Sequence, residues 1–178
     1  MLRKIFIFIY ILMLSSTCTC YSYSGVIEGF RGMRWGDSVE AVNQSGIFET
    51  ELAEINNYGD GLVAYRAKLT NPSLGGVSLS DNAVCYFIND KFTKITLYYG
   101  RNSDPEGAYN KLVSQITNIW GYTYDKKDKA DTKWARWIIG DDYIIIESDV
   151  FYNGSRIDEL SIGTERYLQE YEVRSNGF

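Results

Sequence analysis

Clusters of turn-forming residues divide the chain into short segments, and this feature constrains the fold most strongly. Residues 56–61, 71–76 and 89–91 are rich in Asn, Asp, Gly and Pro, and they interrupt the first half of the chain. The segment between the first two clusters, 62–69, alternates apolar and polar residues, as a half-buried strand does. Sequential strands joined by short turns pair antiparallel. We therefore predict a first antiparallel meander between Phe48 and Tyr99.

Turn-forming residues also divide the chain after Gly121 into short segments. Expected strands here are 134–139 and 143–151, paired around Gly140-Asp141-Asp142, and 157–162 after an Asn153-Gly154 turn. Asn-Gly tolerates the positive φ angles that a tight hairpin needs. The charged residues 126–133 are interpreted as a loop. This half is predicted to form a second meander.

A long amphipathic helix is predicted between the meanders, over residues 103–120. Asp104 or Ser103 caps it, Pro105 suits its first turn, and Gly121 stops it. Its apolar stripe follows the three-and-four spacing of one helix face: Tyr109, Leu112, Val113, Ile116, Ile119 and Trp120.

The segment before the first meander predicts a strand over 30–35, a turn at Gly36 and a short helix. Asp37 is the expected helix cap, with Glu40 completing a capping box. The predicted fold is therefore α+β, an antiparallel sheet of two meanders with both helices on one face. The two helix-plus-meander halves would form a pseudo-repeat, analogous in element order to TATA-binding-protein-like or β-lactamase-inhibitor-like folds.

The first twenty residues have the pattern of an export signal. Arg3 and Lys4 precede an apolar run, and small residues follow it. Two interpretations stay open: lipidation of Cys18, or ordinary cleavage after Cys18 or Cys20. The expected organisation is a signal peptide over 1–20, a tether over 21–28, a single domain over 29–173 and a tail over 174–178.

Charge and composition exclude several classes of function. The chain has 18 basic and 23 acidic residues and a net charge of −5, which argues against nucleic acid or an anionic membrane surface as a partner. The absence of His excludes Ser-His-Asp and Cys-His catalysis and His-ligated zinc. Cys85 lies in an apolar segment and is expected to be a buried, inert thiol.

Two groups of residues are candidates for a binding site. Arg31, Arg34 and Trp35 could hold an anion or a planar ligand near the first helix, although packing of Trp35 is the simpler interpretation. Four tyrosines flank the long helix and could form an aromatic platform, although burial against that helix competes: Tyr98, Tyr99, Tyr122 and Tyr124.

The acidic residues do not form a recognisable catalytic or metal-binding motif. The spacing of Asp125, Asp128 and Asp131 differs from the ligand spacing of calcium loops. Asp141 and Asp142 fit a hairpin turn. Glu147 and Asp149 share one strand face, which is expected to be the solvent face. We therefore expect no metal ion, no cofactor and no catalytic residue.

The motif Phe-x-Gly-Met-x-Trp-Gly-x-Ser over 30–38 resembles the opening of a loose group of uncharacterised exported bacterial proteins and lipoproteins. The similarity extends over most of 29–150 and implies a location and an architecture, but no activity. The leading hypothesis is a non-enzymatic envelope protein that binds an envelope protein or component, with membrane contact only through a lipid anchor. A small-ligand carrier and a carboxylate-based hydrolase are the alternatives.

Overall fold

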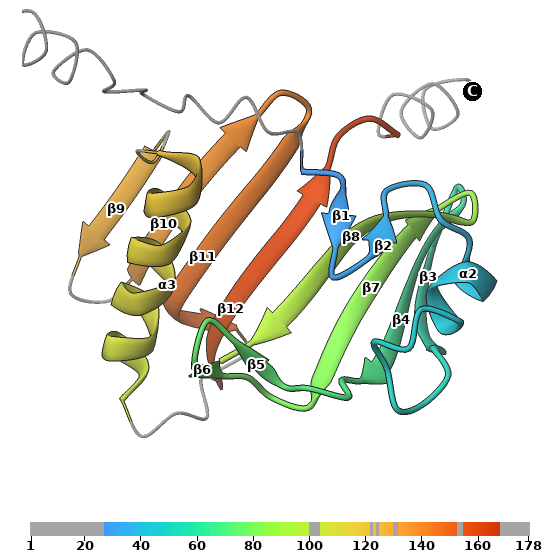
Figure 1. The fold of residues 1–178 in the computed structure, drawn as a ribbon, viewed down its shortest axis with the longest axis horizontal. Coiled ribbons are helices and arrows are strands. Elements are labelled where there is room, and N and C mark those ends of the chain that lie inside the picture. The colour runs from blue at the N-terminus through green and yellow to red at the C-terminus, as the bar shows by residue number, and fades with distance from the viewer. Residues whose placement is uncertain are drawn as a thin grey trace, which may run out of the picture.

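The fold is mostly β (Figure 1). The computed structural model describes residues 27–99, 104–121, 123, 125–129, 132–152 and 155–167. The strands in this part of the chain are β1 (Gly29–Phe30), β2 (Met33–Arg34), β3 (Ala53–Gly59), β4 (Leu62–Lys68), β5 (Ser73–Leu74), β6 (Val77–Ser78), β7 (Asn82–Ile88), β8 (Lys91–Tyr98), β9 (Asp125–Lys129), β10 (Thr132–Ile139), β11 (Asp142–Tyr152) and β12 (Ser155–Thr164). The described helices are α2 (Val39–Asn43) and α3 (Pro105–Trp120).

One eight-stranded antiparallel sheet organises the molecule, in the order β3-β4-β7-β8-β12-β11-β10-β9. The last described strand, β12, lies in the middle, paired with β8 on one side and β11 on the other. In this register Ser161 lies opposite Thr96 of β8 and Ile145 of β11. The centre of the sheet is thus built from segments that are far apart in the sequence.

The α+β prediction is wrong, because this continuous sheet dominates the fold. The described helices have only 5 and 16 residues, and their unequal lengths do not match the predicted pseudo-repeat. The predicted loop over 126–133 instead contributes to β9 and β10, where Lys127 pairs with Trp134. Backbone hydrogen bonds to β10 hold β9 whatever its side chains are, and charged residues suit an edge strand.

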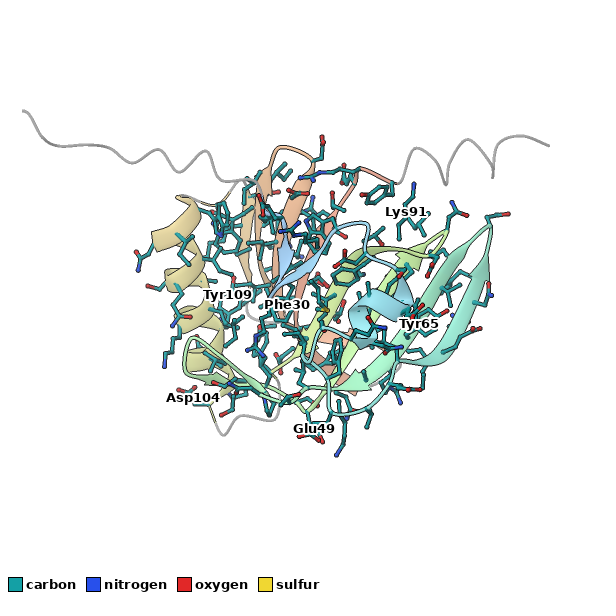
Figure 2. All side chains as sticks on the ribbon, turned by 45° about the vertical axis from the view of Figure 1, so that its right-hand side comes forward. Phe30, Glu49, Tyr65, Lys91, Asp104 and Tyr109 are labelled. Carbon is teal, nitrogen blue, oxygen red and sulfur yellow. The ribbon has the colours of Figure 1, made fainter. Side chains whose placement is uncertain are left out.

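The core lies on one face of the sheet. Figure 1 shows α2, α3 and the hairpins β1–β2 and β5–β6 in front of this face. Contacts join α3 to β11 and β6, and α2 to β8. The sheet contributes alternate apolar residues, including Ile95, Leu97, Ile144, Ile146, Leu160 and Ile162. Phe30 and Tyr109, labelled in Figure 2, lie in the same core cluster. We call this the core face.

The opening segment is a tight hairpin rather than the predicted single strand. Phe30 pairs with Met33, and the two turn residues between them both have positive φ, 51° at Arg31 and 92° at Gly32. Two consecutive positive φ angles close a two-residue turn. The hairpin directs Phe30, Met33 and Trp35 into the core together.

The described helices begin at side-chain caps. Of the two predicted caps, Asp104 is the one that caps α3, because its carboxylate accepts a hydrogen bond from Gly107 N at 2.9 Å. The cap of α2 is Ser38, which accepts from Ala41 N, and not the predicted Asp37. Asp37 instead accepts a hydrogen bond from Arg34 N at 2.7 Å and closes the turn before the helix.

Several predictions fall outside the described residues. These are the signal peptide over 1–20 with Cys18, most of the tether over 21–28, the Asn153-Gly154 turn, the tail over 174–178 and most of an expected helix over 164–173. Among the residues that are described, no helix has the length and apolar character needed to cross a membrane.

Candidate functional site

The face of the sheet opposite the core is the candidate binding surface, and we call it the open face. The described helices and short hairpins lie over the core face (Figure 1), so the open face is presented by strand residues alone within the described part of the chain. Ile138 is 48% exposed there, and Tyr58, which lies near the open-face residues Tyr86 and Tyr98, is 52% exposed. The cross-strand registers place these residues on the open face around its centre: Tyr86, Lys94, Thr96, Tyr98, Arg136, Ile138, Tyr143, Ile145, Glu147, Glu159, Ser161 and Gly163.

A pocket of about 300 Å³ indents the open face over β8, β10, β11 and β12. This volume is at the lower end of the range for ligand pockets. Ser161, which is buried, lies at its bottom, and the exposed Arg136, Ile138 and Glu165 lie at its rim. The half-buried residues that form the walls are Lys94, Tyr143, Ile145, Glu147 and Glu159.

Small residues on the central strand β12 create the pocket. On the open face this strand presents Ser161 and Gly163 between larger neighbours. Gly163 lies opposite Lys94 on β8 and opposite Tyr143 on β11. A Cβ atom on Gly163 would lie 2.5 Å from Tyr143 Oη and 3.1 Å from Thr93 O. The missing side chain therefore gives the Tyr143 ring its place in the pocket wall.

Replacing Gly163 by Ala is expected to move the Tyr143 ring and lower the free energy of unfolding by about 1–2 kcal/mol, as overpacking of a filled site does. Urea denaturation measures the stability change, and the ring signals of Tyr143 in an NMR spectrum measure its displacement. Ser161→Ala is the control for the ring position: it removes the buried hydrogen bond between the Ser161 and Thr96 hydroxyls, so it costs some stability, but it keeps a small residue and should leave the Tyr143 signals in place. Unchanged Tyr143 signals in Gly163→Ala would contradict this account of the pocket.

Two carboxylates face each other in the pocket. Glu147 on β11 and Glu159 on β12 are direct cross-strand partners, an arrangement in which like charges destabilise a sheet. Burial raises the pKa of Glu159, and the charge of Glu147 and a side-chain hydrogen bond with it raise this pKa further. Lys94 opposes these effects without cancelling them. The charges of this pair therefore destabilise the sheet locally, at its central strands.

Lys94 and Arg136, the two cations that line the pocket, each lie near an aromatic ring. Lys94 Nζ lies 4.1 Å from the centre of the Tyr86 ring, and burial lowers the pKa of Lys94 although Glu159 and Glu147 favour its charge. The Arg136 guanidinium lies 5.6 Å from the centre of the Trp134 ring. Lys94 thus lies against an aromatic face while it also acts on both carboxylates, and Arg136 lies near a second aromatic ring.

Tyrosines surround the charged groups and stay protonated at neutral pH. Burial raises the pKa of Tyr143 to about 12, with a smaller effect from Glu165. Burial also raises the pKa of Tyr86 to about 12, helped by Tyr98, Tyr58 and Glu159. These side chains can therefore act as hydrogen-bond donors and as apolar contact area for a ligand.

Replacing Glu159 by Gln is expected to stabilise the protein at pH 7 by about 0.5–1 kcal/mol, since it removes a like-charge cross-strand pair. A carboxyl group whose pKa is raised on folding stabilises the fold below its unfolded pKa, and this contribution is lost as pH rises through the folded pKa. The gain should therefore shrink towards about pH 4, where the wild-type carboxyl is protonated. Urea denaturation at both pH values measures it, with the exposed Glu51→Gln as control. A variant less stable than wild type at pH 7 would refute the proposed destabilisation.

The first group of candidate residues is structural. Arg31 donates hydrogen bonds to Asn71 O, at 2.7 Å, and to Ser73 O, which ties the β1–β2 hairpin to the next loop. Trp35 is 8% exposed, and its Nε1–H donates to Ile27 O at 2.6 Å. The packing interpretation of Trp35 is thus confirmed. Arg34 is exposed beside it.

The tyrosine candidates do not share one surface. Tyr98 lies half-buried on the open face near Glu159, and burial raises its pKa. Tyr99 is fully buried on the other side, and its hydroxyl donates to Glu147 O at 2.6 Å. Tyr122 and Tyr124 lie outside the described residues. Of the two tyrosine candidates that the structure describes, Tyr98 belongs to the candidate site and Tyr99 does not.

The acidic candidates separate in the same way. Glu147 is in the pocket, whereas Asp142 is fully buried near the β10–β11 turn and pairs with Arg166 at 2.7 Å. Sequence reasoning missed Lys94, Glu159 and Gly163 as site residues. The polar alternation of β12 was the available signal, but its pairing partners were not. No group of three or more metal-ligating acidic or Cys side chains occurs in the described ranges.

Comparison of the chain with protein-family models, with curated proteins and with solved structures found no match.

Proposed function

We propose that this chain is an exported, non-enzymatic binding module whose open face binds a partner polypeptide in the cell envelope. The observation that carries the proposal is the arrangement of exposed and half-buried aromatic and aliphatic residues around a charged pocket, on a sheet face that no described helix or hairpin covers (Figure 1). Tyr58 and Ile138 provide exposed apolar area on either side of the centre. Tyrosine is enriched at protein interfaces because it combines a large apolar surface with a polar end.

The charge of the chain favours a basic partner. Eighteen basic residues stand against 23 acidic ones, and the pocket itself is lined by three carboxylates and two cations. Complementary potentials steer encounter and fix the register of an interface. A polypeptide with basic residues among apolar ones fits this surface.

A panel of random displayed peptides, selected on the purified chain, tests the proposal. Selected peptides should lose at least about tenfold in affinity for an Ile138→Asp variant, because a charge then lies in the apolar contact area. The matched control is Ile119→Asp on α3, where Ile119 is 54% exposed outside the open face. Failure to select any peptide contradicts the proposal, as do peptides sensitive to Ile119→Asp but not to Ile138→Asp.

Export supports the envelope location. The signal-peptide pattern over 1–20 supports export. The intact mass of the protein purified from its source cells tests whether this segment is removed. A mass lacking the first 17 residues and carrying lipid is expected if Cys18 is the anchor, and a lipid-free mass beginning after Cys18 or Cys20 is expected for ordinary cleavage. The mass of all 178 residues would contradict the predicted removal of a signal peptide.

The carboxylate pair invites comparison with a glycoside hydrolase. Such enzymes separate their two carboxyl groups by about 5–5.5 Å or by about 6.5–9.5 Å. Glu147 and Glu159 are direct cross-strand neighbours on one sheet face, so their carboxyl groups lie side by side rather than on opposite sides of a bound sugar. A carrier function would need an apolar cavity between sheet and helix, whereas the pocket described here opens on the other face. Binding of a polypeptide therefore fits the geometry better.

A further inference from the structure

Glu147 and Glu159 form a like-charge pair at directly opposed positions on the open face. Both side chains are half-buried on adjacent strands near the centre of an eight-stranded sheet. Like charges at directly opposed positions cost stability, and local rules of this kind are broken mainly at functional sites. A ligand that compensates the charge of the two carboxylates would recover this lost stability.

The surrounding charges leave the pair incompletely compensated. Lys94 on β8 is the cation that acts on both carboxylates, and its Nζ also lies against the Tyr86 ring on β7. Arg136 on β10 is exposed at the rim and lies near Trp134. Glu165, also at the rim, adds a third carboxylate. Tyr98 and Tyr143 are neutral at physiological pH.

The shape of the pocket points to the kind of cation that fits. Ile138, Ile145 and Tyr143 supply apolar walls beside the carboxylates, and the volume is about 300 Å³. Lys and Arg side chains combine a long aliphatic stem with a terminal charge, and the stem packs against apolar surface. A bare metal ion would use only the carboxylates and would leave the apolar walls unmatched.

We propose that the pocket receives one Lys or Arg side chain of the partner polypeptide, with its cation between Glu147 and Glu159 and its stem along Ile145 and Tyr143. This inference rests on the proposed function and names the chemistry of the partner at its central contact. The bound cation replaces the missing compensation, and Ser161 at the bottom of the pocket limits how far the side chain enters.

Peptides selected by display on the purified chain serve as the probe, and their affinities are measured by calorimetry. Selected peptides should share one basic position, and replacing this residue by norleucine should weaken binding roughly 10- to 100-fold, as loss of charge-assisted hydrogen bonds does. The Glu147→Gln/Glu159→Gln variant should show a loss of the same size for the unmodified peptide. It should bind the norleucine peptide about as well as wild type does.

A matched pair of exposed carboxylates controls for general charge attraction. Glu51→Gln/Glu54→Gln removes the same charge from an exposed region and should change affinity less than about twofold. Binding by the wild type should also weaken as pH falls, because burial and the neighbouring Glu147 raise the pKa of Glu159, which therefore takes up a proton before an ordinary exposed glutamate does.

The possible results separate this inference from the proposed function. Peptides that depend on Ile138 but share no basic residue overturn the inference and leave open-face binding intact. Equal losses in the two glutamine pairs also overturn it, since they would indicate attraction to overall charge. If no peptide can be selected, the proposed function and the inference fail together.

Discussion

Replacing Trp35 by Ala is expected to lower the free energy of unfolding by about 3–5 kcal/mol, as removal of a buried Trp does. Its ring lies 5.1 Å from that of Phe92, which is fully buried in β8, and its Nε1–H is bonded to Ile27 O. Gly36 N also donates to Phe92 O at 2.9 Å, so the opening segment is joined to the sheet at this point. Loss of the ring leaves a cavity and an unpaired carbonyl together.

Urea denaturation of Trp35→Ala measures the loss of stability. Two further variants serve for comparison, one that keeps most of the apolar contact and one at an exposed position. Trp35→Phe keeps most of the apolar contact and should cost about 1–2 kcal/mol for the lost hydrogen bond and volume. Ile119→Ala removes an exposed side chain from α3 and should change stability by no more than about 0.5 kcal/mol. A Trp35→Ala effect as small as that of Ile119→Ala would mean that the opening hairpin is not held by the core.

Arg166→Met is expected to destabilise the protein by about 2–3 kcal/mol at pH 7. Arg166 Nη2 donates to Asp142 Oδ2 at 2.7 Å, and the Asp142 side chain is fully buried. Removing one partner of a buried pair typically costs about 3–5 kcal/mol, and the smaller value allows for solvent screening because the Arg166 side chain is 34% exposed. The other carboxylate oxygen, Oδ1, has no hydrogen-bond partner within the described structure.

The pH dependence identifies the cause of this loss. Burial raises the pKa of Asp142, and Arg166 and Thr164 oppose that rise, so without Arg166 the pKa rises further. The contribution of such a group is present below its unfolded pKa and is lost as pH rises through its folded pKa. Arg166→Met should therefore approach wild-type stability near about pH 4, and Asp142→Asn should recover part of the loss at pH 7. An equal loss at both pH values, or one matched by the exposed Arg66→Met, would contradict this explanation.

Local signals in the sequence were sufficient for several elements. The cap Asp104, the apolar stripe and the stop at Gly121 all lie within or next to α3, and the helix follows them. The β7–β8 hairpin also follows its turn, since Asn89 and Asp90 adopt φ angles of 50° and 62°. Each of these elements is held by contacts between residues that are close in sequence, so the local sequence pattern is sufficient to predict it.

The elements that were predicted wrongly depend on distant partners. Asp37 and Ser38 are both good helix caps, and the structure selects Ser38 because Asp37 is already bonded to Arg34 N. The charged segment at 125–129 has no strand-like pattern of its own and becomes β9 only because β10 offers backbone partners. Propensity is overridden where a neighbouring strand supplies the hydrogen bonds.

The candidate site shows the same division. The alternation of the chain correctly directed Glu147 and Glu159 away from the core, but it did not show that they face each other. That pairing depends on the register between β11 and β12, and the pocket depends on β12 lying next to β8. The role of Gly163 in shaping the pocket depends on Tyr143 and Lys94, which lie on either side of it on neighbouring strands, so the local sequence does not reveal it.

Methyl NMR of isoleucine-labelled protein tests the central claim, that the open face with its pocket is the binding surface, most directly. Ile138 and Ile145 lie on the open face, and Ile119 lies exposed on α3. On addition of a selected peptide, the Ile138 and Ile145 methyl signals should shift while the Ile119 signal stays in place. A shift of Ile119 with Ile138 and Ile145 unchanged would show that the partner binds elsewhere, and the account of the open face would be wrong.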